Sequence, residues 1–312
     1  MIPAFTLAYD AVLLLADLSL DSALETLGRA RESYGLPLPA LSSGELSRWL
    51  SGNTPRWYTP SPLYMALTGR RPYKPVRLCP ELGYWVGAYL SDGSRCGIAN
   101  VRDLEFAMNM AAAATAASGW RHGAREARLW DSKQRRRIAV WRVPIGSAAL
   151  EYLRRSGLYA IVALRYPAEF ARGLFDGDGG IYVGVSEKHN AFPYALTLTL
   201  SKHEERIADF AEKFMREEFG IKLKRNHVKR DGSIELRACD KGSIRKFHEA
   251  IGFSIGWKRE LCDDLLRILK LRSNREKIKE WTRTYIKLGN KWVKPRWLNE
   301  PKWRWYWRVR GC

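Results

Sequence analysis

The sequence lacks any apolar run of the roughly 20 residues that a membrane-spanning helix needs. Near the N-terminus, the stretch LAYDAVLLLADLSL is interrupted by Asp10 and Asp17 and has no basic residue before it. A signal peptide would carry both a basic start and an uninterrupted apolar core. We therefore expect an amphipathic helix at this position, no membrane partner and a cytoplasmic location.

Paired cysteines are also absent. The five cysteines are scattered along the chain without a CxxC spacing, which argues against a zinc site or a disulfide framework and fits a reducing compartment. Glutamine is almost missing, since Gln134 is the only one. This scarcity and the 28% of charged residues resemble the composition of thermophile proteins.

Acidic residues are scarce relative to basic ones. The chain has 53 Lys and Arg against 33 Asp and Glu, which gives a formal net charge of +20. Half of this excess lies in residues 271–312, where 13 basic residues accompany 3 acidic ones. Such a balance predicts a polyanionic partner, and nucleic acid is the default.

The same C-terminal segment is rich in tryptophan. Indole rings can stack on bases or pair with cations, and they can equally pack a tail onto a core. We favour a docked tail whose basic edges touch phosphate. Six of the 13 tryptophans lie in this segment: Trp281, Trp292, Trp297, Trp303, Trp305 and Trp307.

Two similar segments are ELGYWVGAYLSDGS from Glu81 and EFARGLFDGDGG from Glu169, and their last acids, Asp92 and Asp178, lie 86 positions apart. In both, small residues recur every four positions, which places them on one face of a helix. Two such faces can approach closely, so we expect the helices to pack side by side. That packing would bring Asp92 and Asp178 to the same end of the pair. The small residues are Gly83, Gly87 and Ser91 in the first segment and Gly173 and Gly177 in the second.

Two carboxylates at this place are unfavourable on their own. Each faces the negative end of a helix dipole, and the two repel each other. A divalent cation between them reverses this cost, and hard oxygen ligands favour Mg²⁺ over Zn²⁺. The predicted metal ligands are Asp92 and Asp178, with the preceding residues Ser91 and Gly177 as further candidates.

A single DxDG has two other interpretations. It also occurs in calcium-binding loops, and Glu187 falls at the twelfth position counted from Asp176. However, Gly180 and Ile181 stand where that loop needs Asp or Asn followed by Gly. A lone Asp-Gly is usually a turn, but two copies at this spacing favour a shared site.

Together the two segments resemble the paired helices of the LAGLIDADG homing endonucleases, in the monomeric, two-motif form found in archaeal introns. In the first copy, residues 85–93 have Leu90 where the motif has its earlier Asp, which is not the catalytic acid of the family. That copy keeps Gly87, Asp92 and Gly93. The second copy, residues 171–179, matches at Gly173, Leu174, Asp176, Asp178 and Gly179. The resemblance extends over about 190 residues.

This resemblance implies a monomer that cuts both strands of a long double-stranded DNA site. It implies Mg²⁺ held by Asp92 and Asp178, with Mn²⁺ as a substitute and Ca²⁺ supporting binding without cleavage. A basic residue would polarise the attacking water or steady the phosphate. The candidates are Lys258 in the second half and Lys133 in the first.

The element order predicts an α+β fold with two pseudo-symmetric αββαββα halves, each with an antiparallel sheet, which together form a saddle. In the first half we expect strands over residues 95–102 and 104–110 and a helix over 111–119. We expect a long helix over residues 266–286. The predicted domains are a helical, helix-turn-helix-like module (1–52), a Pro-rich linker or docking segment (53–80), two halves (81–166 and 167–270) and a basic, Trp-rich tail (271–312).

Basic residues on the strands predict a DNA-binding face, because residues of equal parity project to the same side of a strand and the major groove admits β-ribbons. In the N-terminal module, Ser47 and Arg48 would face a groove. The predicted contacts from the two halves are Arg95, Arg125, Arg128, Arg135, Arg137, Arg142, Lys222, Lys224 and Arg237.

Two alternatives use the same fold. One is a DNA-binding regulator without catalysis, whose mark would be a lost acid, and both acids are present. The other is an intron-splicing maturase that binds intron RNA, which a basic surface would serve equally well. The sequence favours an intron-encoded endonuclease and leaves the maturase open.

Overall fold

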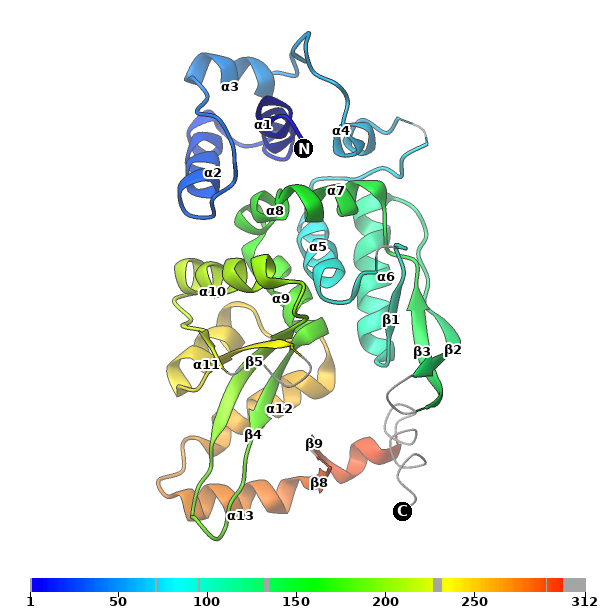
Figure 1. The fold of residues 1–312 in the computed structure, drawn as a ribbon. Helices are drawn as coiled ribbons and strands as arrows, with labels where there is room; N and C mark the ends of the chain where they lie inside the picture. The colour runs from blue at the N-terminus through cyan, green and yellow to red at the C-terminus, as the bar shows by residue number, and fades with distance from the viewer. Residues whose placement is uncertain are drawn as a thin grey trace.

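The computed structural model describes residues 2–70, 72–94, 96–131, 135–226, 232–289 and 291–299. The fold is α+β. Figure 1 shows N-terminal helices at one end of the molecule, a central layer of helices, and two sheets at the other end. Within these described ranges, no helix combines the length and the apolar character needed to cross a membrane.

The N-terminal helices form a module that continues into the Pro-rich segment. In α3, Ser42 and Glu45 form a capping box, which fixes the start of the helix. Leu46 and Trp49 are buried, while Ser47 is exposed. The four helices are α1 (Ala4–Leu13), α2 (Leu20–Glu32), α3 (Ser43–Leu50) and α4 (Pro62–Leu67).

A buried carboxylate joins this module to the central layer. Asp10 is fully buried and accepts hydrogen bonds from the hydroxyls of Tyr58 (2.5 Å), Ser61 (2.8 Å) and Tyr152 (2.5 Å). Tyr152 belongs to α7 (Ala148–Ser156). Three donors replace the lost water around the carboxylate, so residues 53–80 dock against the core at this point.

The central layer is built on two helices, α5 (Pro80–Asp92) and α9 (Pro167–Asp178). Each begins with proline at its first position, which suits a helix start because that N–H has no partner in the helix. Nearly every side chain of α5 is buried, from Leu82 to Leu90. Helix α8 (Tyr159–Arg165) leads directly into α9 and packs against α5.

The first half has a three-stranded antiparallel sheet in the order β1-β3-β2. The predicted strand over residues 104–110 is wrong, because α6 (Leu104–Ser118) begins there. Asp103 caps this helix by accepting hydrogen bonds from the N–H groups of Glu105 and Phe106, and the alanine-rich run that follows is a strong helix former. The described residues therefore hold one strand, not two, between α5 and α6. The strands are β1 (Ala99–Val101), β2 (Arg125–Asp131) and β3 (Arg136–Val143).

The second half follows the expected order α-β-β-α-β-β-α. Its strands form one antiparallel sheet in the order β4-β5-β7-β6, which leaves β4 at the edge nearest α9. The strands are β4 (Gly179–Val183), β5 (Tyr194–Leu200), β6 (Lys224–Arg225) and β7 (Ile234–Ala238). The helices after α9 are α10 (Glu205–Phe219) and α11 (Lys241–Ala250).

The C-terminal segment docks on the second half. The predicted helix over residues 266–286 is wrong, because Ser273 and Glu276 form a capping box that starts a new helix. Trp281 and Trp297 are buried, so tryptophan packs the described part of the tail onto the core. Trp303, Trp305 and Trp307 lie outside the described residues. The elements are α12 (Gly256–Ile268), α13 (Asn274–Thr284), β8 (Ile286–Leu288), β9 (Lys291–Val293) and the 3₁₀ helix η1 (Pro295–Asn299).

Candidate functional site

The site begins with the close approach of α5 and α9. A methyl group added at Gly87 would lie 2.2 Å from the carbonyl oxygen of Phe170, and one added at Gly173 would lie 2.2 Å from that of Tyr84. Neither backbone could accept a side chain at these positions. The side-by-side packing predicted from the glycine spacing is therefore present in the structure.

This packing brings the two motif acids together. Both stand at the C-terminal ends of their helices, and a side chain added at Gly177 of α9 would lie 2.5 Å from Oδ2 of Asp92. Burial raises the pKa of Asp92 to about 6. Burial, and then repulsion from Asp92, raise the pKa of Asp178 well above its ordinary value. The sequence prediction that Asp92 and Asp178 meet is confirmed.

A third carboxylate adds to the negative field. Glu204, just before α10, raises the pKa of both Asp92 and Asp178. No sequence pattern marks Glu204 for this role, because Glu204 and Glu205 are adjacent acids at the start of a helix. Within the described residues, no three Asp, Glu, His or Cys side chains gather closely enough to hold a metal ion. The candidate site therefore rests on two carboxylates.

The predicted basic residue Lys258 lies at the C-terminal end of α9, the helix that ends with Asp178. Its Nζ is buried and donates hydrogen bonds to the carbonyl oxygens of Asp176 (2.6 Å), Gly179 (2.7 Å) and Phe175 (3.1 Å). The carbonyl of Phe175 also accepts the N–H of Gly179, but the last carbonyls of a helix lack partners in the next turn, and a cation is favourable at the negative end of the helix dipole. Lys258 thus closes the end of α9 and lowers the pKa of both acids.

Arg154 of α7 holds the matching place at the end of α5. Its Nη1 donates to the carbonyl oxygen of Gly93 (3.1 Å), and its Nη2 contacts Oε1 of Glu204 (2.9 Å). Gly93 follows Asp92 as Gly179 follows Asp178, so each Asp-Gly end is bonded to one cation. Arg154 was not predicted from the sequence. Lys133, the basic residue predicted for the first half, lies outside the described residues.

The other acid of the second motif has a structural position. Asp176 is buried and accepts hydrogen bonds from the hydroxyl of Tyr84 (2.9 Å) and the N–H of Ser254 (3.1 Å). It therefore connects α9 to α5 and to the turn before α12. Leu90 occupies the corresponding place in the first motif and is also buried. An apolar side chain fills that place without needing polar partners.

Asp92, together with Gly177 and Gly179 on either side of Asp178, lines a groove between the sheets. A cavity of about 660 Å³ is lined by Asp92, by Asn100 and Arg102 of the first half, and by Tyr182 and Thr197 of the second. Its walls thus come from both halves of the molecule. A polyanion lying in the groove would reach both sheets and Asp92 at once.

In the second sheet, the predicted basic residues share the face that borders the groove. Lys224 pairs with Arg237 across β6 and β7, and Arg237 pairs with Thr197 of β5. Residues directly opposite in a ladder project to the same side, and Thr197 lines the cavity. Arg237 also contacts Glu235 (2.7 Å) and lies over the ring of Tyr182. Lys222 is exposed just before β6.

In the first sheet, the register divides the predicted arginines between two faces. Arg125 pairs with Arg142, which pairs in turn with Asn100 at the cavity. Arg128 and Arg137 pair with Ala139 and Trp130 and lie on the opposite face. The expectation of a single basic face is therefore wrong for this sheet, because the chosen residues differ in strand parity. Arg135 is exposed in the turn between β2 and β3, and Arg95 lies outside the described residues.

Comparison with known families bears on this geometry. Residues 165–252 match a LAGLIDADG-like domain. Domains of this family are typically nucleases and bind DNA. The match begins just before α9, contains Asp178 and ends after α11, so the first motif helix and Asp92 lie outside it. Among curated proteins, no significant match to the chain is found.

Proposed function

We propose that this protein is a site-specific endonuclease that recognises a long double-stranded DNA target and cuts both strands as a monomer. The observation that carries the proposal is the meeting of Asp92 and Asp178 at the adjoining ends of α5 and α9. Asp92 and the two glycines that flank Asp178 line a groove that both sheets border. The DNA-binding and nuclease character of LAGLIDADG-like domains supports the same function.

The donor set fits a divalent cation. Asp92 and Asp178 supply hard oxygen ligands. Their pKa values are raised first by burial and then by neighbouring carboxylates, and a bound cation would offset this cost of ionisation. Mg²⁺ is commonly bound by one or two carboxylates together with phosphate oxygens and water. When bound, such an ion supplies an activated water and stabilises charge on the leaving oxygen. We propose Mg²⁺ with Mn²⁺ as a substitute, and Ca²⁺ as an ion that permits DNA binding alone.

The protein's own groups orient this centre. Lys258 fixes the end of α9 through three carbonyls, and Arg154 fixes the end of α5 through Gly93. Lys258 also lowers the pKa of both acids and so favours their charged forms. The lining of the groove comes from both halves, so a bound duplex could contact both sheets.

Digestion of a randomised DNA library tests the proposal. We expect Mg²⁺-dependent double-strand cuts within one recurring sequence, and none by the Asp92→Asn, Asp178→Asn double variant. A parallel reaction with structured intron RNA tests the maturase alternative. If the wild-type protein cuts no duplex and instead promotes splicing, the endonuclease proposal is wrong.

A further inference from the structure

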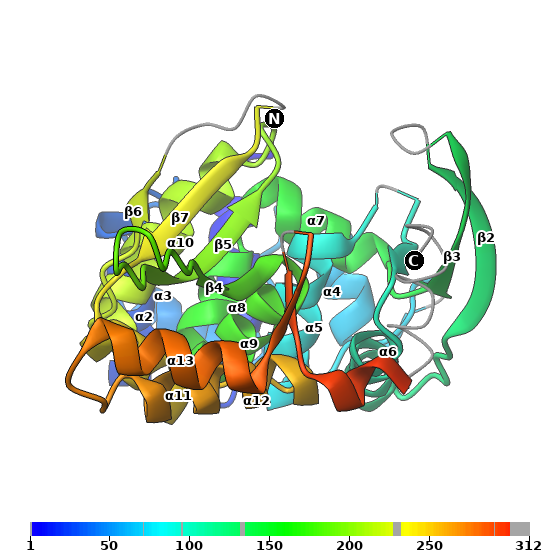
Figure 2. The same ribbon diagram turned by 90° about the horizontal axis from the view of Figure 1, so that it is seen from below.

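The C-terminal β8–β9 hairpin lies inside the groove. Seen from the sheet side in Figure 2, β8 and β9 cross in front of α5 and α9, between the two sheets. Lys291 and Trp292 of β9 line the same cavity as Asp92. The indole N–H of Trp292 donates to the carbonyl oxygen of Val183 in edge strand β4 (2.8 Å). The hairpin therefore forms part of the site's wall.

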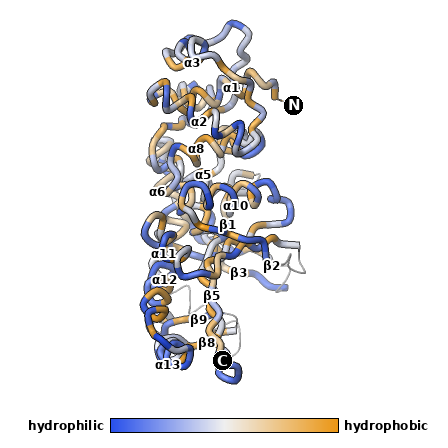
Figure 3. The backbone as a smooth tube through the Cα atoms, turned by 90° about the vertical axis from the view of Figure 1, so that its left-hand side faces the viewer, coloured by the Kyte–Doolittle hydropathy of each residue, from blue (hydrophilic) through white to orange (hydrophobic). Residues whose placement is uncertain are grey.

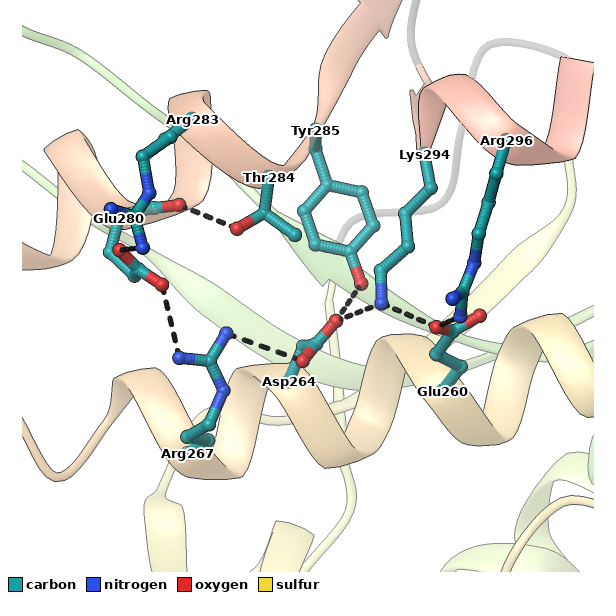
Figure 4. A network of polar contacts seen from close by, with 9 residues as sticks. All are labelled: Glu260, Asp264, Arg267, Glu280, Arg283, Thr284, Tyr285, Lys294 and Arg296. Atoms are coloured by element: carbon teal, nitrogen blue, oxygen red, sulfur yellow. Dashed lines mark hydrogen bonds and ion pairs between the residues drawn. The ribbon is translucent and has the colours of Figure 1, made fainter.

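Polar contacts hold the hairpin's base against α12. Lys294 contacts both Glu260 and Asp264 at 2.5 Å, and the hydroxyl of Tyr285 donates to Asp264 (2.8 Å), as Figure 4 shows. Burial raises the pKa of Asp264, but hydrogen bonds from Lys294 and Tyr285 outweigh this effect and hold the pKa below its ordinary value. Trp281 is buried and stacks on the ring of Tyr285. The hairpin is thus supported by a packed base.

The charge of the hairpin decides whether it would compete with DNA for the groove or bind DNA there. Residues 285–294 contain three lysines and no acid, and Lys294 pairs with the carboxylates of α12. Lys287 is exposed and lies 5.8 Å from the ring centre of Trp292. In the described part of the chain, no carboxylate pairs with it. A segment that competes with DNA for a basic groove would need negative charge, whereas this hairpin adds positive charge.

We propose that the β8–β9 hairpin is a DNA-contacting element that holds the phosphate backbone beside the catalytic acids through Lys287 and Lys291. This inference rests on the proposed function, because it requires a duplex in the groove. It makes the C-terminal segment part of the substrate-binding surface. DNA would then meet three protein surfaces in the groove: the two sheets and the hairpin.

Salt-dependent binding in Ca²⁺ tests the proposal on the full chain. Replacing a lysine that contacts phosphate should flatten the slope of log affinity against log salt by about 0.9. We expect this for Lys287→Ala and for Lys291→Ala, and about twice the change in the double variant. Lys270→Ala makes the same change at an exposed site between α12 and α13, before the N-terminal end of α13. This control should leave the slope unchanged. Melting temperatures close to wild type would show that all variants fold.

Hydroxyl-radical footprinting of the same complexes locates the contact. The double variant should lose backbone protection next to the two cut positions and keep it elsewhere. An unchanged slope with an unchanged footprint would overturn the proposal, and tighter binding would instead make the hairpin an obstacle to DNA. If the wild-type protein binds no duplex, the proposed function fails with it. If the wild type binds and the variants match it, only the hairpin's role is wrong.

Discussion

At the scale of single residues, the two motif acids and Lys258 could be predicted, whereas Arg154 and Glu204 could not. Asp92 and Asp178 each end a helix with a glycine face, and that local pattern determines where they meet. Arg154 and Glu204 reach the site only because α7 and α10 fold back toward the ends of α5 and α9. No local spacing marks such residues, since their partners lie 50 or more positions away.

Removing either acid should separate cleavage from binding. Asp92→Asn and Asp178→Asn keep the side-chain shape and remove one charge that the metal needs. We expect double-strand cleavage to fall by about 10³-fold or more, the scale of losing a group that stabilises transition-state charge, with DNA affinity in Ca²⁺ retained. Asp21→Asn, an exposed acid of α2, is the matched control. Wild-type cutting by either motif variant would show that the acids are not catalytic.

The raised pKa values predict an unusual pH dependence of stability. The pKa of Asp92 rises from its ordinary 3.8 to about 6, so between these values the folded state binds more protons than the unfolded state. Stability of the metal-free protein therefore falls as pH rises through this window, by at most roughly 3 kcal/mol for this group. Asp92→Asn should melt above wild type at pH 8, with a difference that vanishes toward pH 4.

Thermal melts with and without Mg²⁺ check this assignment. The cation should raise the wild-type melting temperature at pH 8, because it offsets the repulsion that Asp92 and Asp178 exert on each other. The Asp92→Asn variant should gain less. Equal melting temperatures for the two proteins at every pH would mean that the carboxylates are well solvated.

At the scale of elements, prediction succeeded where periodicity and chemistry agreed. In the second half, the alternating run over residues 194–201 predicts a strand and the glycine-ended pattern over 203–220 predicts a helix. Both agree with β5 and α10 to within two residues at each end. The predicted strand over residues 104–110 was wrong, because apolar residues without clear alternation are compatible with either a helix or a strand. The deciding feature was the cap at Asp103. A capping box at Ser273 likewise divides the predicted C-terminal helix into α12 and α13, so capping residues outweighed the longer pattern.

Packing of α5 on α9 makes a specific prediction for glycine. Even a methyl group at Gly173 would lie 2.2 Å from a backbone oxygen of α5, and overpacking of this kind costs about 1–3 kcal/mol or more. Gly173→Ala should therefore lower the melting temperature and the cleavage rate together. Gly28→Ala is the matched control, because Gly28 lies inside α2 with nothing within 4 Å of the added group. There the same change should stabilise by about 0.4–1 kcal/mol.

At the scale of the whole molecule, the N-terminal module lies far from the groove. Figures 1 and 3 place α3 at one end and the β8–β9 hairpin at the other, with the helices of the central layer between them. Asp10 and its three hydroxyl partners connect the module firmly to that layer. The sequence predicted a small helical module with an exposed polar face but not where it docks, because docking depends on contacts between Asp10 and Tyr152 that lie 142 positions apart.

This placement predicts that α3 does not touch a duplex bound in the groove. Arg48→Glu reverses a charge on the exposed face of α3, yet interactions between exposed charges are largely screened beyond about 10 Å at 0.1 M salt. Affinity for a duplex no longer than the cleavage footprint should change by less than about twofold, a bound set by that screening. Lys224→Glu, an equal reversal on the groove face of the second sheet, should weaken the same complex strongly. Comparable losses from both variants would show that one DNA segment reaches both ends of the protein. A loss from Arg48→Glu confined to longer DNA would instead mean that the helix-turn-helix-like module binds a second segment.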